Sequence, residues 1–158
     1  MTTRPIPYLP GADTADDLWW LYDHVRFMEK NYPGVEYSLS FPRLRTIKGR
    51  EFAVCDVDDV TFIKIICLTR ALFPRVGINL STRENQTLRD HALELGVTKI
   101  SAASKTSVGG YTADTEEELN PQFDIQDERS VDEIVKMLKM RNFDPVFTDW
   151  RRIDNEPL

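Results

Sequence analysis

The amino-acid sequence predicts an α/β fold in which helices alternate with parallel strands. Apolar residues recur at helical spacing at about 15–32, 56–73 and 85–95, and again from residue 130. Between these segments lie short runs at 35–41, 76–80 and 97–103 that have the length and composition of strands. Strict alternation implies parallel strands joined by right-handed crossovers. The 158 residues suffice for one domain with a substantial core.

The first helix is expected over about residues 15–32, after an irregular lead-in at residues 1–14. Trp19 and Trp20 are adjacent and cannot both face one core, so one of them is expected to cover a neighbouring element. Pro33 and Gly34 end the helix. Its apolar stripe consists of Leu18, Leu21, Tyr22, Val25 and Met28.

The segment 35–41 is expected to form a strand with one polar face, because apolar residues alternate there with Glu36, Ser38 and Ser40. A strand covered by helices on both faces would be apolar throughout, so the pattern suits a barrel strand that lines a polar cavity. An antiparallel edge strand with one wet face is the alternative. Arg43 and Arg45 follow this strand, where they would either steer anions or pair with carboxylates of a neighbouring loop.

The second helix is expected to begin at the aspartates Asp56, Asp58 and Asp59, with Asp56 as its N-cap. These carboxylates lack the glycine and distal glutamate of a calcium loop, so capping is the favoured interpretation. The helix is apolar nearly all round, which predicts that it is buried or contacts a partner. Cys67 is expected in the core, and its spacing from Cys55 indicates neither a disulfide nor a cysteine-rich metal site.

Polar residues follow the next two strands at the points where these strands end. They are Ser81, Thr82, Arg83 and Glu84 after the first, and Ser101, Ser104, Lys105, Thr106 and Ser107 after the second. Ligands of α/β folds bind at the carboxyl ends of parallel strands, so these residues predict part of a floor for a small anionic ligand. Ser81 and Glu84 also have capping-box spacing, and part of this polarity would then only start the next helix.

The remainder of the chain predicts one more amphipathic helix. Gly96 is a fitting C-cap for the helix at residues 85–95. Further along the chain, residues 112–127 are acidic and loop-like. Ser130 and Glu133 form a capping box for a helix with Val131, Ile134, Val135 and Leu138 on one face.

The whole chain is 41% hydrophobic and 29% charged, with a net charge of −6 and no basic run. Nucleic acid and anionic membrane are therefore not expected as partners, and no signal peptide or membrane span is apparent, which predicts a cytoplasmic location.

Five motifs in order resemble the C-terminal half of the radical S-adenosylmethionine tyrosine lyases, most closely those of thiamine biosynthesis, which make 2-iminoacetate. The resemblance covers roughly residues 20 to 152. Its motifs are Tyr37–Arg45, Leu80–Glu84, Ser101–Thr106 with Gly109–Tyr111, Gln122–Phe123 with Asp127–Ser130, and Pro145–Trp150.

The resemblance implies a partial (β/α)8 TIM barrel, in which residues 15–111 supply the last three parallel strands with their flanking helices. Residues 112–158 would form the C-terminal associated region, a helical extension. The family reaction cleaves tyrosine between Cα and Cβ to dehydroglycine and p-cresol, using S-adenosylmethionine and a [4Fe–4S] cluster. By the same resemblance, Arg83 would pair with the substrate carboxylate. Ser81, Ser101, Ser104, Arg43 and Arg45 would line the pocket, whereas no catalytic residue is implied.

The chain departs from this family in lacking the Cys-x-x-x-Cys-x-x-Cys motif that holds the cluster. No cofactor or metal site is therefore expected in this chain alone, which is predicted to be inactive by itself. A complementing N-terminal half is one expected partner, and self-association through open strand edges is another. A non-catalytic binding or regulatory half-barrel is the alternative function. An unrelated enzyme using Arg83 and Glu84 would lack a nucleophile–base pair.

Overall fold

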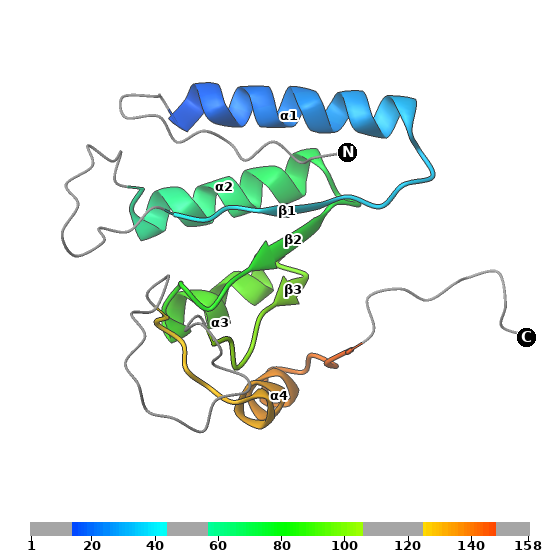
Figure 1. Cartoon of the computed structure of the whole chain (residues 1–158). Coiled ribbons are helices and arrows are strands. Elements are labelled where there is room, and N and C mark those ends of the chain that lie inside the picture. The colour runs from blue at the N-terminus through cyan, green and yellow to red at the C-terminus, as the bar shows by residue number, and fades with distance from the viewer. Residues whose placement is uncertain (1–13, 44–56, 106–124, 148–158) are drawn as a thin grey trace, which may run out of the picture.

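The computed structural model describes residues 14–43, 57–105 and 125–147 of the chain. Helices and strands alternate in the order that the sequence predicts, so the predicted α/β class is confirmed. Arg45, Cys55, Asp56 and the Gly109–Gly110 pair lie outside the described residues. The elements are α1 (Thr14–Asn31), β1 (Ser38–Ser40), α2 (Asp59–Leu72), β2 (Gly77–Leu80), α3 (Gln86–Glu94), β3 (Lys99–Ile100) and α4 (Val131–Met140) (Figure 1).

The three strands form one parallel sheet in the order β1-β2-β3. Ser38 pairs with Gly77, and Asn79 pairs with Lys99, which excludes the alternative of an antiparallel edge strand. Both outer strands are shorter than predicted. Next to β3, the amide of Ile78 donates to the Thr98 hydroxyl at 2.9 Å instead of to a strand carbonyl. The ladder therefore begins only at Lys99, although the apolar pattern starts at residue 97.

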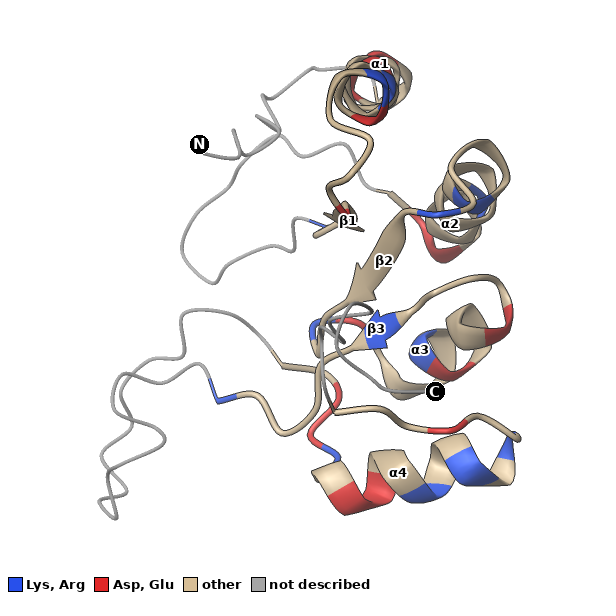
Figure 2. Cartoon of the chain, turned by 90° about the vertical axis from the view of Figure 1, so that its right-hand side faces the viewer, with Lys and Arg blue, Asp and Glu red and all other residues tan. Residues whose placement is uncertain are grey.

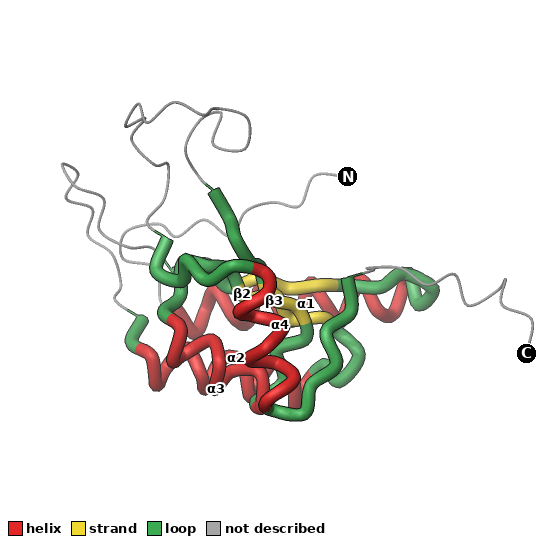
Figure 3. The backbone as a smooth tube through the Cα atoms, turned by 90° about the horizontal axis from the view of Figure 1, so that it is seen from below, coloured by secondary structure: helices red, strands yellow, loops and turns green. Residues whose placement is uncertain are grey.

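In the described part of the chain, α2 and α3 lie on one side of the sheet, and no helix covers its other side (Figures 2 and 3). We call that other side the open face. Ile78 and Leu80 of β2 are buried among apolar residues of α2 and α3, among them Phe62, Ile66 and Ala92. Because side chains alternate along a strand, Asn79 and its neighbours Ser38 and Lys99 belong to the open face. This arrangement of a three-strand arc fits part of a barrel, with the polar face where a barrel interior would be.

A second apolar cluster joins α1 to the sheet near the amino ends of the strands. It contains Tyr22, Val25, Phe73 and Val76. The rings of Tyr22 and Phe73 lie 5.4 Å apart at a tilted angle, and the Tyr22 hydroxyl forms a 2.7 Å hydrogen bond with that of Thr69. The predicted apolar stripe of α1 is thus confirmed at its centre, where Tyr22 and Val25 are buried.

The capping predictions have mixed outcomes. Asp58, not Asp56, caps α2, because its carboxylate accepts from the amide of Thr61. Asn85, not Ser81, caps α3 by accepting from the amide of Leu88, so the predicted Ser81–Glu84 capping box is wrong. The Ser130–Glu133 capping box of α4 is confirmed. Gly96 has φ +111°, and a Cβ there would lie 2.8 Å from the Arg70 side chain, so a glycine is required after α3.

One burial prediction is wrong. Cys67 is exposed, because it lies on the side of α2 opposite the buried Ile65, Ile66 and Thr69. Trp19 and Trp20 are both largely exposed, at 66% and 70% of their surface, but Trp19 borders α2 in an apolar groove that Leu68 and Leu72 also line. Among the described residues, none of the helices is both long and apolar enough to cross a membrane.

Candidate functional site

The carboxyl ends of β2 and β3 lie at one edge of the sheet, and the polar residues predicted to bind substrate follow them there. Leu80 pairs with Ile100, so Ser81 and Ser101 come directly after paired positions on adjacent strands. We call Ser81, Arg83, Ser101 and Ser104 the strand-end rim. Ser101 is exposed, and the other three side chains are partly exposed.

The open face of the sheet continues from the rim toward the amino ends of the strands. Alternation places Ser81 on the same face as Asn79, and the Ser38 hydroxyl donates to the Asn79 side-chain oxygen at 2.9 Å. Lys99 lies beside Asn79 on β3. A polar face of this kind is compatible with water or a polar ligand rather than with a covering helix.

Arg43 lies on the other side of the sheet, in an ion-pair cluster with Glu84 and Asp59. Its guanidinium donates to both carboxylate oxygens of Glu84, and to Asp59 at 2.7 Å. The same guanidinium donates to the carbonyl of Val57 at 2.9 Å and lies 4.7 Å from the centre of the Phe62 ring. Of the two interpretations that the sequence left open for Arg43, the structure therefore shows pairing with carboxylates.

Burial by itself lowers the pKa of Arg43, but the hydrogen bonds and charges of Glu84 and Asp59 raise it by more, so the pKa lies above its usual value. Both Arg43 and Glu84 have nearly inaccessible side chains. The pair joins the segment after β1 to the segment after β2, next to Arg83. Arg43 thus supports the rim from behind rather than belonging to it.

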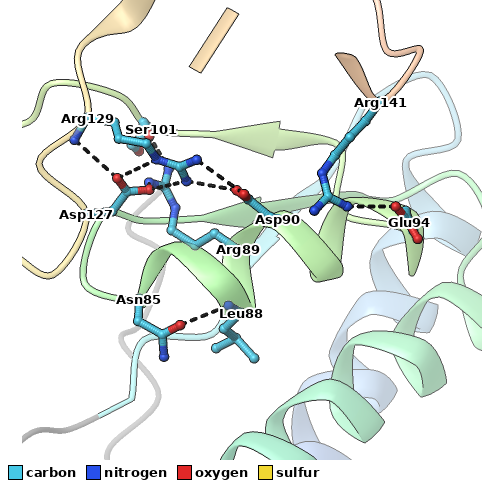
Figure 4. Close-up of polar contacts among 9 residues, drawn as sticks. All are labelled: Asn85, Leu88, Arg89, Asp90, Glu94, Ser101, Asp127, Arg129 and Arg141. Carbon is cyan, nitrogen blue, oxygen red and sulfur yellow. Dashed lines mark hydrogen bonds and ion pairs between the residues drawn. The ribbon is translucent and has the colours of Figure 1, made fainter. Parts of the chain in front are cut away.

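A second cluster of charged residues lies behind the ends of β2 and β3 (Figure 4). Arg89 of α3 donates to the carboxylate of Asp127 and to the backbone carbonyl of Ser101. Arg129 donates to the same carboxylate at 2.7 and 2.9 Å, and to Asp90 at 2.8 Å. We call Arg89, Asp90, Asp127 and Arg129 the four-charge cluster. Its two arginines and two aspartates balance in charge, which makes their burial feasible.

The protonation states of this cluster follow from its contacts. Burial raises the pKa of Asp127, but hydrogen bonds from Arg129 and the charges of both arginines outweigh it, so the pKa lies below its usual value. Burial also lowers the pKa of Arg89, against the opposing charge of Asp127. A guanidinium has so high an intrinsic pKa that Arg89 stays charged at neutral pH, and Asp127 stays ionised beside it.

The main chain reinforces the same junction. The amides of Gln126 and Asp127 donate to the carbonyl of Thr82 at 3.0 and 3.1 Å. The amide of Ala103 donates to the carbonyl of Arg129 at 3.3 Å, and Ala103 has a φ of 48°. Non-glycine residues adopt such backbone angles only when their surroundings hold them. The segment 126–129 therefore bridges the ends of β2 and β3.

Two hollows lie elsewhere on the described surface. One of about 930 Å³ is at the amino ends of the strands, lined by charged residues of several elements that include Glu29, Arg70 and Lys99. The other, of about 300 Å³, is an apolar groove between α1 and α2, lined by Leu18, Trp19, Leu68 and Leu72 among others. Neither of these two hollows is lined by a residue of the strand-end rim.

The residues of this chain do not fit an iron–sulfur cluster. Such clusters are held by cysteine thiolates, and the sequence contains only Cys55 and Cys67. Within the described ranges, no group of three or more His, Cys, Asp or Glu residues could hold a metal ion.

The sequence does not predict how charged residues support the rim. Glu84 and Asp127 belong to motifs named above, but their pairing with Arg43 and Arg89 is not apparent there, and Arg89 and Asp90 are not among the predicted site residues. Arg89 carried one signal, because it sits between Leu88 and Ala92 of α3, at the border of the apolar face. A charge at such a position indicates a buried partner. The partner itself could not be read from sequence, since Asp127 is 38 positions away.

Comparison with known proteins adds to this geometry. Residues 40–144 match the family model described as the Biotin and Thiamin Synthesis associated domain. The chain is 37% identical over 134 residues to 2-iminoacetate synthase of Salmonella typhimurium strain LT2, and 35% identical to that of Escherichia coli strain K12. Each alignment covers 85% of this chain and 35% of the relative, so the chain spans about a third of the curated relatives.

Solved structures agree with this assignment. The FeFe-hydrogenase maturase HydG from Carboxydothermus hydrogenoformans matches with a TM-score of 0.70 and 35% identity, over 84% of this chain and 30% of that one. A second structure of HydG, a maturase of the [FeFe]-hydrogenase, matches with a TM-score of 0.76 and 32% identity, over 89% of this chain and 31% of that one. The resemblance seen in the sequence motifs is confirmed, and the chain belongs to the Biotin and Thiamin Synthesis associated domain family.

Proposed function

We propose that this chain supplies the substrate-binding strand ends of a radical S-adenosylmethionine tyrosine lyase of the 2-iminoacetate synthase type. The observation that carries the proposal is the strand-end rim, which joins hydroxyls and a guanidinium at the carboxyl edge of a parallel sheet. Identities of 35–37% to two 2-iminoacetate synthases support tyrosine as the ligand. In this role the chain binds and orients substrate, while the cluster chemistry belongs to another polypeptide segment.

Arg83 is the rim residue best suited to hold the carboxylate of tyrosine. A guanidinium is always charged and offers a planar fork of donors that matches the two oxygens of a carboxylate. Arg83 lies two residues after Ser81, in the turn between β2 and α3, at the carboxyl end of the strand. Ser81, Ser101 and Ser104 would donate to or accept from the remaining polar groups of the substrate.

Completion of the site requires further strands and thiolates. In the described part of the chain, β1 pairs only with β2 and β3 pairs only with β2, so each presents an open edge. The apolar groove between α1 and α2 and the exposed Trp19 lie at the β1 end of the arc, where another barrel unit would pack. We infer that a cluster-binding half of the barrel joins there. A cytoplasmic location for this assembly remains a prediction.

The test is reconstitution of the chain with a polypeptide that carries the cluster-binding half of a 2-iminoacetate synthase. Arg83→Lys keeps the charge but loses the two-pronged geometry, so tyrosine affinity should fall by about 1–3 kcal/mol, the scale of a hydrogen bond to a charged group. Calorimetry with tyrosine measures the change.

Arg75→Lys is the matched control, because Arg75 is an exposed arginine just before β2, at the opposite end of the same strand. It should leave tyrosine affinity unchanged. Equal affinity of the Arg83→Lys and Arg75→Lys proteins would remove Arg83 from the site.

A non-catalytic binding or regulatory protein is the second candidate function. It is favoured by the cysteine content, since two cysteines cannot supply the three thiolates of the family motif. The same reconstitution separates the two candidates. Release of p-cresol from tyrosine by the reconstituted pair supports the lyase role. Tyrosine binding without p-cresol, using an active cluster-binding half, supports the alternative.

A further inference from the structure

We propose that Arg89 and Asp127 are positioning residues that fix the separation between the ends of β2 and β3, and with it the spacing of the strand-end rim. This inference rests on the proposed function of the rim, because it concerns how these side chains are presented to substrate. Both residues act through backbone atoms next to the rim rather than through contact with a ligand.

Arg89 connects α3 directly to the end of β3. Its side chain is 1% exposed and reaches from the helix to the carbonyl of Ser101, a rim residue, with one terminal nitrogen. The other terminal nitrogen pairs with Asp127 (Figure 4). Because the guanidinium is planar and rigid, holding these two partners sets the position of the Ser101 carbonyl relative to Asp127.

Asp127 connects the Arg89 guanidinium to the end of β2. Its own amide and that of Gln126 donate to the carbonyl of Thr82, which lies between Ser81 and Arg83 in the chain. Two residues further on, the carbonyl of Arg129 accepts from the amide of Ala103 beyond β3. Neither strand end can move without breaking charge-assisted or main-chain hydrogen bonds to this segment.

Stability alone does not account for such an arrangement. Buried ion pairs can often be replaced by apolar residues of similar volume without loss of stability. Arg89 also leaves its Nε buried without a hydrogen-bond partner among the described residues, which is unfavourable. Apolar side chains would avoid that cost, but they would not fix directions as charge-assisted hydrogen bonds do. What the cluster supplies is a defined geometry at the rim.

The first test compares amide resonances of the 158-residue chain by nuclear magnetic resonance, in the wild type and in Asp127→Asn. The variant should shift the amides of Arg83, Ser101 and Ala103, while those of α1 stay in place. Glu94→Gln is the matched control, because it also neutralises a carboxylate paired with an arginine, but in the more exposed Glu94–Arg141 pair. It should leave the rim amides unmoved.

A purely stabilising role predicts a different result, namely a lower midpoint of unfolding with unchanged rim amides in the folded protein. That result would overturn the proposal. If Asp127→Asn does not fold, Arg129→Lys gives the same readout, because it alters the outer, more exposed part of the four-charge cluster while keeping its charge. Unmoved rim amides in a folded Arg129→Lys protein would equally contradict the proposal.

The second test measures tyrosine affinity in the reconstituted pair. Asp127→Asn should weaken binding by about tenfold, and its effect should shrink in an Arg83→Lys background, because the two residues would act on one interaction. If Arg83→Lys weakens binding and Asp127→Asn does not, the positioning role fails while the proposed function stands. If neither does, the proposed function fails, and shifted rim amides would then show a purely structural linkage.

Discussion

At the amino ends of the strands, α1 packs through Tyr22 and Val25 onto Phe73 and Val76. Hydrogen bonds of two tyrosine hydroxyls, Tyr22 with Thr69 and Tyr37 with the Met28 carbonyl, add to this mainly apolar contact. At the carboxyl ends of β2 and β3, the contacts are instead made by Arg89, Asp127 and their charged neighbours. Both regions are buried and both join a helix to the same sheet. The two regions differ in how strictly their contacts depend on the relative orientation of the contacting atoms.

Apolar packing is non-directional, so small changes of shape at the α1 contact are tolerated as long as volume is kept. Charge-assisted hydrogen bonds require particular atoms at particular angles. The region with directional contacts is the one that carries the strand-end rim. The comparison indicates that stability is provided throughout the core, whereas a fixed geometry is provided where ligand contacts are expected.

The largest effect on stability is expected from Asp127→Asn, which removes a charge from the carboxyl-end region while changing almost no side-chain volume. The variant leaves the buried Arg89 without a full opposite charge, and breaking a buried ion pair by removing one partner costs about 3–5 kcal/mol. Urea denaturation followed by circular dichroism should show a correspondingly lower free energy of unfolding. A loss below that of Tyr22→Phe would contradict the assigned difference between the two regions.

Acid should reproduce part of that loss in the unmodified protein. The pKa of Asp127 is lower in the folded chain than in the unfolded one, mainly through Arg129 and Arg89 acting against burial. Such a carboxylate contributes stability above its unfolded pKa of about 3.9, and the contribution is lost as pH falls through the folded pKa.

The free energy of unfolding of the wild type should therefore decline more steeply below about pH 4 than that of Asp127→Asn, which has no carboxylate to protonate there. Urea titrations of both proteins at several pH values measure the two slopes. Parallel pH profiles would argue that Asp127 is not held ionised by its arginines.

Tyr22→Phe is the corresponding isosteric change in the apolar region. It removes the hydroxyl that bonds Thr69, but the Thr69 hydroxyl keeps its 2.7 Å bond to the carbonyl of Ile65. The expected cost is about 1 kcal/mol, the net value of one neutral hydrogen bond. Thermal unfolding monitored by circular dichroism is sufficient to measure it, with the wild type as reference.

Glu94→Gln should have the smallest effect. Glu94 and Arg141 form a 2.8 Å ion pair between α3 and the end of α4, but 59% of the Glu94 side chain is exposed. Exposed pairs are screened by water and salt, and they contribute about 0–1 kcal/mol. A loss comparable to that of Asp127→Asn would mean that burial is not what separates the two ion pairs.

The order and type of the elements could be predicted because they depend on local periodicity. The stripe around Tyr22 and Val25 and the Ser130 capping box involve residues within a few positions of one another. The strands are shorter than their sequence patterns predict, because a strand ends where its partner stops pairing, which the residue types at 97 and 98 do not reveal. Cys67 was misplaced because α2 has apolar residues on nearly every side, so the pattern did not show which side faces the sheet.

The rim residues could be proposed from sequence because strand ends and polar side chains coincide there. Their supports could not, since each depends on a partner far along the chain. Glu84 has the spacing of a capping residue, yet it pairs with Arg43, 41 positions away. Similarly, nothing near Asp127 in the sequence shows that it meets Arg89.

The bridging segment 126–129 also has a consequence for the order of folding. β2 and β3 are joined through α3 alone, so their pairing closes a shorter loop than the pairing of β1 with β2 and should form with the smaller entropy loss. The segment that ties these two strand ends together follows β3 by more than twenty residues. During synthesis, the sheet can therefore pair before its carboxyl edge is fixed, because residues 126–129 emerge only after all three strands.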